Sequence, residues 1–135
     1  MIAENLRSYL LTSFPPQKVL DVRIGLGYTA AQLEDGSVGT AYTFRHEALG
    51  GCSVFRGKRP LSGRSTVELL DYLTSKDPIE AAVGLAVANA LVNRPSPEQQ
   101  EGDILAQLAL KPEDRVGMVG YFGPLVGPLK ARVCE

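Results

Sequence analysis

The densest group of potentially reactive side chains is the stretch Arg45-His46-Glu47, with Cys52 a few residues later. An imidazole, a carboxylate and a thiolate can together bind a transition metal ion. His46 is the only histidine of the chain, so one chain cannot supply a site with two histidines. His46, Glu47 and Cys52 are therefore candidate metal ligands. The alternative interpretation is a hydrogen-bonded surface histidine and a cysteine that acts as a small apolar residue.

A second candidate is the stretch between Gly117 and Pro124, in which glycines recur in the spacing G-x-x-G-x-x-G. Glycines at a strand-to-helix turn free backbone N–H groups, and the N-terminus of the following helix favours an anion. The spacing is neither the dinucleotide-binding G-x-G-x-x-G nor a P-loop, and Pro124 lacks an N–H donor. Gly120 and Gly123 are thus candidate ligand-binding positions, with a merely tight turn as the alternative.

Two polar side chains complete the set of candidate binding residues. Arg45 follows a predicted strand and could hold an anionic group of a ligand. Asn89 lies within an apolar helical stretch, where a buried amide without partners costs about 1–3 kcal/mol. Asn89 therefore either bonds to a neighbouring strand or loop, or points into a ligand cleft. A hydrolase with a G-x-S-x-G nucleophile is not indicated, because that motif is absent.

The element expected to position these groups is a helix over residues 77–93. Asp77 is the predicted N-cap, Pro78 occupies the first helical position, and Glu80, three residues after the cap, is expected to form a capping box with Asp77. Nearly every residue from Ile79 to Val92 is apolar, and no polar face is present. A helix that is apolar all round is a buried helix, and this one is shorter than the roughly 20 residues that span a membrane.

Before this helix, the patterning predicts one helix, three strands and a second helix that the capping box at residues 65–68 opens, with Leu69, Leu70 and Leu73 facing inward. The apolar residues of segment 1–13 recur at helical spacing, and prolines end that segment. Alternation with a period of two predicts strands over residues 19–26, 28–33 and 38–44. Asp35-Gly36 is a strong hairpin signal between the last two strands. The predicted sheet is a three-stranded antiparallel meander, and small residues on one face of its third strand leave room for a packed helix or a ligand.

The segments on either side of the central helix differ in kind. Residues 45–63 show no periodicity, and an irregular stretch of this length in a compact domain is usually functional or disordered. After Pro95 the predicted order is a short helix, a buried strand over 115–121, the glycine turn and a helix, which is how an α/β domain begins. We therefore expect an α+β domain over residues 1–95 and the start of an α/β unit over 96–135. The second unit is too short for a doubly wound sheet, which indicates a fragment of a longer protein.

Composition argues against several classes of function. The net charge of −1 provides no field that would attract nucleic acid or a membrane surface. Two cysteines far apart in the sequence suggest neither a disulfide framework nor a zinc knuckle. With no signal peptide and no apolar span, the expected location is cytoplasmic. The expected partners are a small molecule or a metal ion, and a second copy of the chain in a homo-oligomer is a further expectation.

Four motifs taken together resemble a family of uncharacterised prokaryotic proteins labelled “putative heavy-metal chelation”. They are residues 39–45 (GTAYTFR), 61–64 (LSGR), 84–91 (GLAVANAL) and 116–125 (VGMVGYFGPL). The resemblance implies an enolase N-terminal-like α+β domain over residues 1–95, then the opening of a Rossmann-like domain over 96–135, with a site between the two. It assigns no catalytic residue, but Arg45, Asn89 and the stretch Gly120–Gly123 fall in the shared motifs.

The leading expectation is a protein that chelates a heavy metal or binds an anionic small ligand at the inter-domain cleft. A transition metal ion is the expected cofactor. A competing hypothesis is an enzyme, a lyase or transferase, that acts on an anionic substrate at the same cleft. A third is an assembly module whose α/β half is completed by another chain. Metal titration, turnover after loss of Arg45 and sedimentation discriminate between the three.

Overall fold

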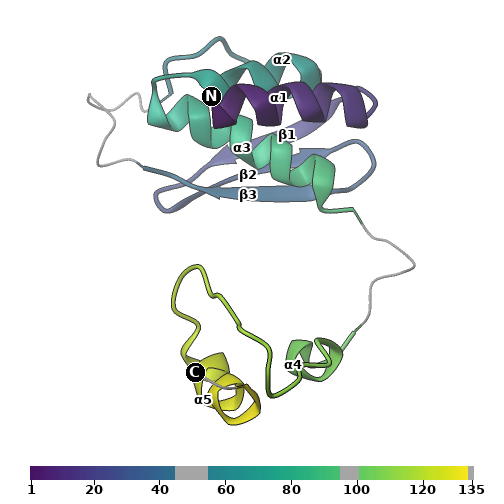
Figure 1. The fold of residues 1–135 in the computed structure, drawn as a ribbon. Coiled ribbons are helices and arrows are strands. Elements are labelled where there is room, and N and C mark those ends of the chain that lie inside the picture. The colour runs from purple at the N-terminus through teal and green to yellow at the C-terminus, as the bar shows by residue number, and fades with distance from the viewer. Residues whose placement is uncertain (45–54, 95–100, 134–135) are drawn as a thin grey trace. The chain divides into compact units, whose positions relative to one another are not determined.

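A computed structural model of the chain describes residues 1–44, 55–94 and 101–133. The chain divides into two compact units, Met1–Pro95 and Ser96–Glu135, and each is considered by itself (Figure 1). Among the described residues, no helix has both the length and the apolar character needed to cross a membrane.

The first unit contains an antiparallel sheet with helices packed over one face (Figure 1). Its elements in chain order are α1 (Ile2–Ser13), β1 (Val19–Ile24), β2 (Tyr28–Leu33), β3 (Val38–Tyr42), α2 (Thr66–Leu70), the 3-10 helix η1 (Asp71–Thr74) and α3 (Pro78–Val92). The strand order is β1-β2-β3, so β2 is central and β3 is an edge strand. The predicted three-stranded antiparallel meander is confirmed, and the unit has an α+β fold.

The hairpin between β2 and β3 closes at the predicted dipeptide. Gly36 adopts a positive φ of 86°, a conformation that is easily reached only by glycine. The Ser37 backbone N–H donates to the Asp35 carboxylate at 2.9 Å, and this bond lowers the pKa of the Asp35 carboxyl below its ordinary value. The turn thereby fixes the register in which Ala31 of β2 lies opposite Gly39 of β3.

Helix α3 forms the centre of the core. The Asp77 carboxylate caps it by accepting from the backbone N–H groups of Ile79 at 2.8 Å and Glu80 at 3.2 Å. The Glu80 carboxylate accepts from the Ser75 hydroxyl at 2.6 Å, so it does not complete the expected capping box. The sheet packs against one side of α3, and α2 and η1 pack against another. The apolar stretch is therefore a buried helix, as its sequence predicts.

Two glycines allow α3 to approach its neighbours closely. A Cβ on Gly39 of β3 would lie 2.1 Å from the Ala90 nitrogen and 2.2 Å from the Ala86 oxygen. A Cβ on Gly84 of α3 would lie 2.5 Å from the Leu73 nitrogen of η1. Backbone atoms cannot yield to such contacts as a flexible side chain can, so both positions require glycine at this spacing. The small face of β3 is occupied by a packed helix, one of the two alternatives for that face.

The second unit contains the helices α4 (Ile104–Gln107) and α5 (Gly123–Arg132) within its described residues. The Arg132 guanidinium donates to the Leu105 carbonyl oxygen and so ties α5 to α4. The prediction of a buried strand over residues 115–121 is wrong, because this segment forms no strand. A strand needs a neighbour for its ladder of hydrogen bonds, and the described part of this unit provides none.

We predict that Gly39→Ala destabilises the fold by about 1–3 kcal/mol or more, because the added methyl group meets helix backbone rather than a movable side chain. The matched control is Gly27→Ala, since a Cβ at Gly27 meets nothing within 4 Å. Denaturant unfolding followed by circular dichroism measures both variants. Equal stability of the two variants would contradict the close approach of α3 to β3.

Candidate functional site

Four of the predicted site residues lie outside the residues that the structure describes: Arg45, His46, Glu47 and Cys52. Their segment is bounded by Phe44, just beyond β3, and by Phe55, whose side chain is buried. Among the described residues there is no group of three or more histidine, cysteine, aspartate or glutamate side chains that could hold a metal ion. The prediction of metal ligands at His46, Glu47 and Cys52 therefore rests on the sequence of this segment.

Phe55 anchors one end of that segment to the core. Its ring packs with Ile79 and Val83 of α3 and meets the Tyr72 ring edge to face, with centroids 5.8 Å apart. A Cβ on Gly57 would lie 2.7 Å from the Tyr72 hydroxyl oxygen, so the backbone also passes close to this ring. The residues that directly follow the segment with the candidate metal ligands (residues 45–54) are thus held in place by contacts with buried aromatic and aliphatic side chains.

The same part of the chain concentrates positive charge. Between positions 55 and 64 the sequence has four basic residues and no acidic residue. The Arg59 guanidinium lies over the Phe55 ring, 5.6 Å from its centroid. Arg64 donates to the Glu68 carboxylate at 2.7 Å, and this bond, with a second to the Tyr72 hydroxyl, raises the pKa of Arg64. These basic residues follow the segment that contains the candidate metal ligands directly in the sequence, and one of them, Arg64, is paired with Glu68.

Asn89 bonds to the sheet. Its Nδ2 donates to the backbone carbonyl oxygen of Thr40 in β3 at 2.7 Å. One helical turn further on, Nδ2 of Asn93 donates to the Val38 carbonyl oxygen at 3.2 Å. A groove of about 560 Å³ runs along the same residues and is lined by Val38, Gly39, Thr40, Asn89, Val92 and Asn93. The structure therefore shows the bond to a neighbouring strand that was one of the two interpretations of Asn89.

Gly120 and Gly123 lie at the turn that precedes α5. Gly120 adopts a φ of 86°, which favours glycine, and Gly123 is the first residue of the helix. The Phe122 N–H lies 3.4 Å from the Met118 sulfur, so this donor is engaged within the turn. The N-terminus of α5 has no side-chain cap among the described residues, and within its first turn the Leu125 N–H donates to the Phe122 backbone oxygen at 2.9 Å.

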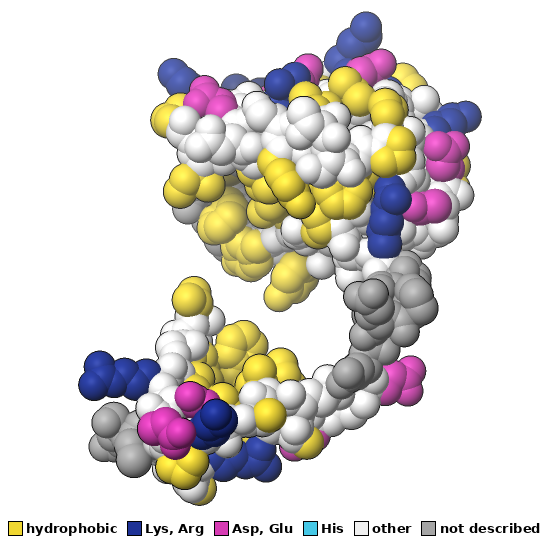
Figure 2. Space-filling model, turned by 45° about the vertical axis from the view of Figure 1, so that its right-hand side comes forward, with side chains coloured by type: hydrophobic (Ala, Val, Ile, Leu, Met, Phe, Trp, Pro, Cys, Tyr) yellow, Lys and Arg dark blue, Asp and Glu magenta, His cyan; other side chains and the backbone are white. Residues whose placement is uncertain are grey.

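The second unit exposes large apolar side chains around this turn. Val119 is 99 % exposed, and Tyr121 and Phe122 are exposed as well. Hydrophobic side chains gather on the visible surface of each unit (Figure 2). Within the second unit, a groove of about 550 Å³ is lined mostly by aliphatic side chains, with Arg115 and Lys130 among them. So much exposed apolar surface in a small unit is typical of a contact region.

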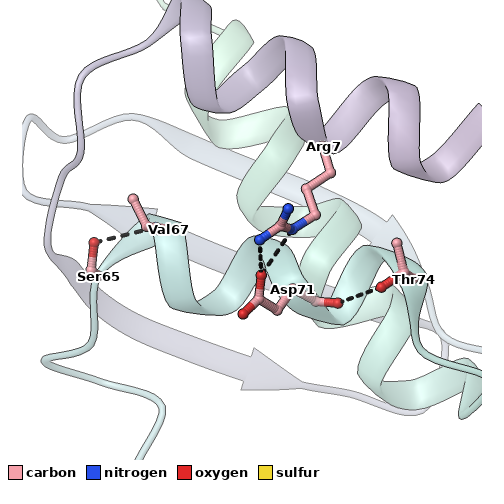
Figure 3. Close-up of polar contacts among 5 residues, drawn as sticks. All are labelled: Arg7, Ser65, Val67, Asp71 and Thr74. Carbon is pink, nitrogen blue, oxygen red and sulfur yellow. Dashed lines mark hydrogen bonds and ion pairs between the residues drawn. The ribbon is translucent and has the colours of Figure 1, made fainter.

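A polar cleft that the sequence patterns did not indicate lies where α1 meets η1 (Figure 3). Arg7 Nε donates to the Asp71 carboxylate at 2.8 Å, and a second guanidinium nitrogen bonds to the same oxygen. The Thr74 hydroxyl donates to the Asp71 backbone carbonyl oxygen at 3.0 Å, and Glu4 and Ser8 line the cleft. Arg7 and Asp71 are 64 positions apart, so no local spacing could have identified the pair.

An antiparallel meander packed on a buried helix, followed by a smaller separate unit, makes this an α+β protein. The sequence identifies it further, because residues 7–92 match the family described as “Putative heavy-metal chelation”. The chain belongs to this family, which confirms the resemblance seen in its motifs.

Two solved structures share the fold. A protein of unknown function from the DUF364 family of Pyrococcus horikoshii is 24 % identical with a TM-score of 0.66, and the match covers 98 % of this chain and 55 % of that chain. A DUF364 protein of unknown function from Desulfitobacterium hafniense is 21 % identical with a TM-score of 0.60, covering 96 % and 54 %. The chain thus spans about half the length of these proteins. No protein with a curated description matches it.

We predict that the Arg7–Asp71 pair stabilises the fold only weakly. The two side chains are 34 % and 62 % exposed, and exposed ion pairs contribute about 0.2–1 kcal/mol, less at high salt. A double-mutant cycle with Arg7→Ala, Asp71→Ala and both together measures the coupling from denaturant unfolding. A coupling above about 2 kcal/mol that persists in high salt would contradict a merely structural surface pair.

Proposed function

We propose that the protein binds a transition metal ion and that His46, Glu47 and Cys52 supply its ligands. The observation that carries this proposal is the match of residues 7–92 to a family described by heavy-metal chelation. All three residues lie within the matched range, and they are the densest set of metal-binding groups in it. An imidazole, a carboxylate and a thiolate suit Zn²⁺ and softer ions. The chemistry of this donor set therefore fits the family description.

An anionic group is the second part of the proposed ligand. Three protein ligands leave at least one coordination position of a tetrahedral metal ion open. Arg45 precedes His46 directly, and the basic residues between positions 55 and 64 follow the segment. A carboxylate or phosphate bound at the open position would pair with these charges. This combination favours a chelated metal–anion complex over a bare ion as the ligand.

The finer architecture that we propose is an enolase N-terminal-like domain over residues 1–95 and the start of a Rossmann-like domain over 96–135. The likeness to solved proteins of nearly twice this length supports a second domain that extends further. In this arrangement the ligand would occupy an inter-domain cleft, with Asn89, Gly120 and Gly123 as further binding positions. The uncapped N-terminus of α5 supports an anion near Gly123.

We predict that the full chain binds one Zn²⁺ per molecule in isothermal titration calorimetry. His46→Ala and Cys52→Ser should each weaken binding by about tenfold or more, because each removes a ligand. The matched control is Cys134→Ser, which removes the other cysteine of the chain. Affinity should rise with pH, because protons compete with the metal for the imidazole and the thiolate. Unchanged binding by the double variant His46→Ala/Cys52→Ser would overturn the ligand assignment.

A second proposal concerns the second unit, which we infer is an assembly module completed by another chain. Val119, Tyr121 and Phe122 are largely exposed. The segment 115–121, whose apolar sequence predicts a buried strand, has no neighbouring strand among the described residues. An apolar segment that lacks both burial and ladder partners acquires both when another strand pairs with it. This observation favours the assembly module among the functions considered from the sequence.

We predict that the amides of residues 115–122 exchange with solvent at nearly the rate of an unfolded chain, because no ladder protects them. The buried helix α3 in the same molecule is the internal reference, and its amides should exchange many orders of magnitude more slowly. Hydrogen exchange of the full chain read by mass spectrometry measures both segments. Strong protection of residues 115–122 in the isolated, monomeric chain would contradict the incomplete second unit.

A further inference from the structure

Among the described residues, no strand pairs with the outer edge of β3 (Figure 1). The Leu33 N–H donates to the Ser37 oxygen at 2.9 Å, and the Thr43 N–H donates to the Gly27 oxygen at 2.9 Å. These bonds show that the odd-numbered residues of β3 turn their backbone N–H and C=O groups toward β2. In an antiparallel ladder the even-numbered residues between them turn these groups away from β2. The open edge therefore consists of Val38, Thr40 and Tyr42.

This strand lacks the features that usually protect an exposed edge. Natural edge strands are blunted by charged side chains, prolines or bulges. β3 reads Val-Gly-Thr-Ala-Tyr, which contains no charge and no proline, and its register with β2 is unbroken. Val38 and Tyr42 are 45 % and 50 % exposed. Such a strand is suited to pairing with another uncharged strand.

Two side-chain amides, one within α3 and one at its C-cap, cover two of the three outward carbonyl oxygens of this edge instead. Asn89 reaches the Thr40 oxygen at 2.7 Å and Asn93 reaches the Val38 oxygen at 3.2 Å. A carbonyl oxygen that already accepts from a side-chain amide must lose that bond, or share it, before it accepts from an incoming strand. The amides therefore oppose strand addition without placing a charge at the edge.

The helix beside this edge carries an exposed apolar stripe. Leu85, Asn89 and Val92 stand at positions i, i+4 and i+7, so they share one face of α3. Leu85 is 39 % and Val92 51 % exposed, although the other branched aliphatic residues of α3 are buried. Val92 also lines the groove that contains Thr40 and Asn89. Pairing at the edge would cover this stripe only if the partner also brought a helix to it.

We propose that the outer edge of β3, with Leu85 and Val92 beside it, is a pairing surface for a second copy of this chain. In this proposal Asn89 and Asn93 hold the surface closed by occupying two of its carbonyl oxygens, those of Thr40 and Val38. The inference is independent of the proposed metal site, since it uses none of the candidate metal ligands.

A second copy fits this surface because the surface is complementary to itself. Antiparallel pairing centred on Thr40 places Thr40 of the two copies opposite each other and Val38 opposite Tyr42 of the second copy. The sheet then continues from one copy into the other. Because α3 packs over both β2 and β3, the same two-fold symmetry brings the two α3 helices side by side and covers Leu85 and Val92.

The test is the double variant Asn89→Ala/Asn93→Ala of the full chain, studied by sedimentation velocity over a range of concentrations. Each substitution frees one edge carbonyl oxygen, and at Asn89, which lies within the helix, alanine is a better helix former than asparagine. The self-association constant should rise by about tenfold or more relative to the parent chain, with a species of twice the mass. Circular dichroism checks that the variant remains folded.

Two controls separate edge pairing from other causes of association. Asn5→Ala removes an exposed asparagine of α1 that makes no side-chain bond to β3, and it should leave the association constant unchanged. Asp77→Ala removes the N-cap of α3 and destabilises the fold by about 0.5–2 kcal/mol, yet it keeps both amides. Association of the Asp77→Ala variant as strong as that of the double variant would assign the effect to loss of stability and overturn the proposal.

A reversal variant locates the contact. Adding Thr40→Lys to the double variant places like charges directly opposite each other at the centre of the paired edges. The Thr40 side chain is exposed, so the lysine is accommodated in the monomer. Association should return to the level of the parent chain. The proposal is overturned if the lysine leaves association unchanged, or if the double variant associates no more than the parent.

Discussion

The close approach of α3 to the β3 backbone is the contact on which the rest of the first unit depends. Gly39 on the sheet side and Gly84 on the η1 side leave no space for a Cβ, so the helix is held between two backbone surfaces. Close-packed interiors transmit such constraints, because a shift of one element forces its neighbours to move. At this spacing the short side chain of Asn89 reaches the Thr40 oxygen. A helix held further away by a methyl group at Gly39 would lose this bond.

The parts of the fold that the sequence predicted correctly are those with a local physical cause. Asp77 caps α3 because a carboxylate can reach the N–H groups two and three residues on. The dipeptide Asp35-Gly36 forms its hairpin because glycine adopts the positive φ that the turn needs. The all-apolar helix is buried because it has no face that water could cover. In each case the cause lies within a few residues of the effect.

The predictions that failed or remain untested depend on distant residues. The segment 115–121 has the composition of a buried strand, but a strand exists only beside a partner, and composition cannot supply one. Arg7 and Asp71 meet only because the fold brings α1 to η1. His46, Glu47 and Cys52 lie outside the described residues, so their placement stays a prediction. For Asn89 the sequence identified the need for a partner and left open whether that partner was a strand or a ligand.

The choice of amides at the β3 edge also bears on how charge is distributed in this chain. Lysines on β3 would protect the edge, but they would add positive charge away from the basic residues that stand between positions 55 and 64. Asn89 and Asn93 satisfy two edge carbonyl oxygens while remaining neutral. The edge strand therefore carries no charge of its own, and side-chain amides rather than lysines protect it.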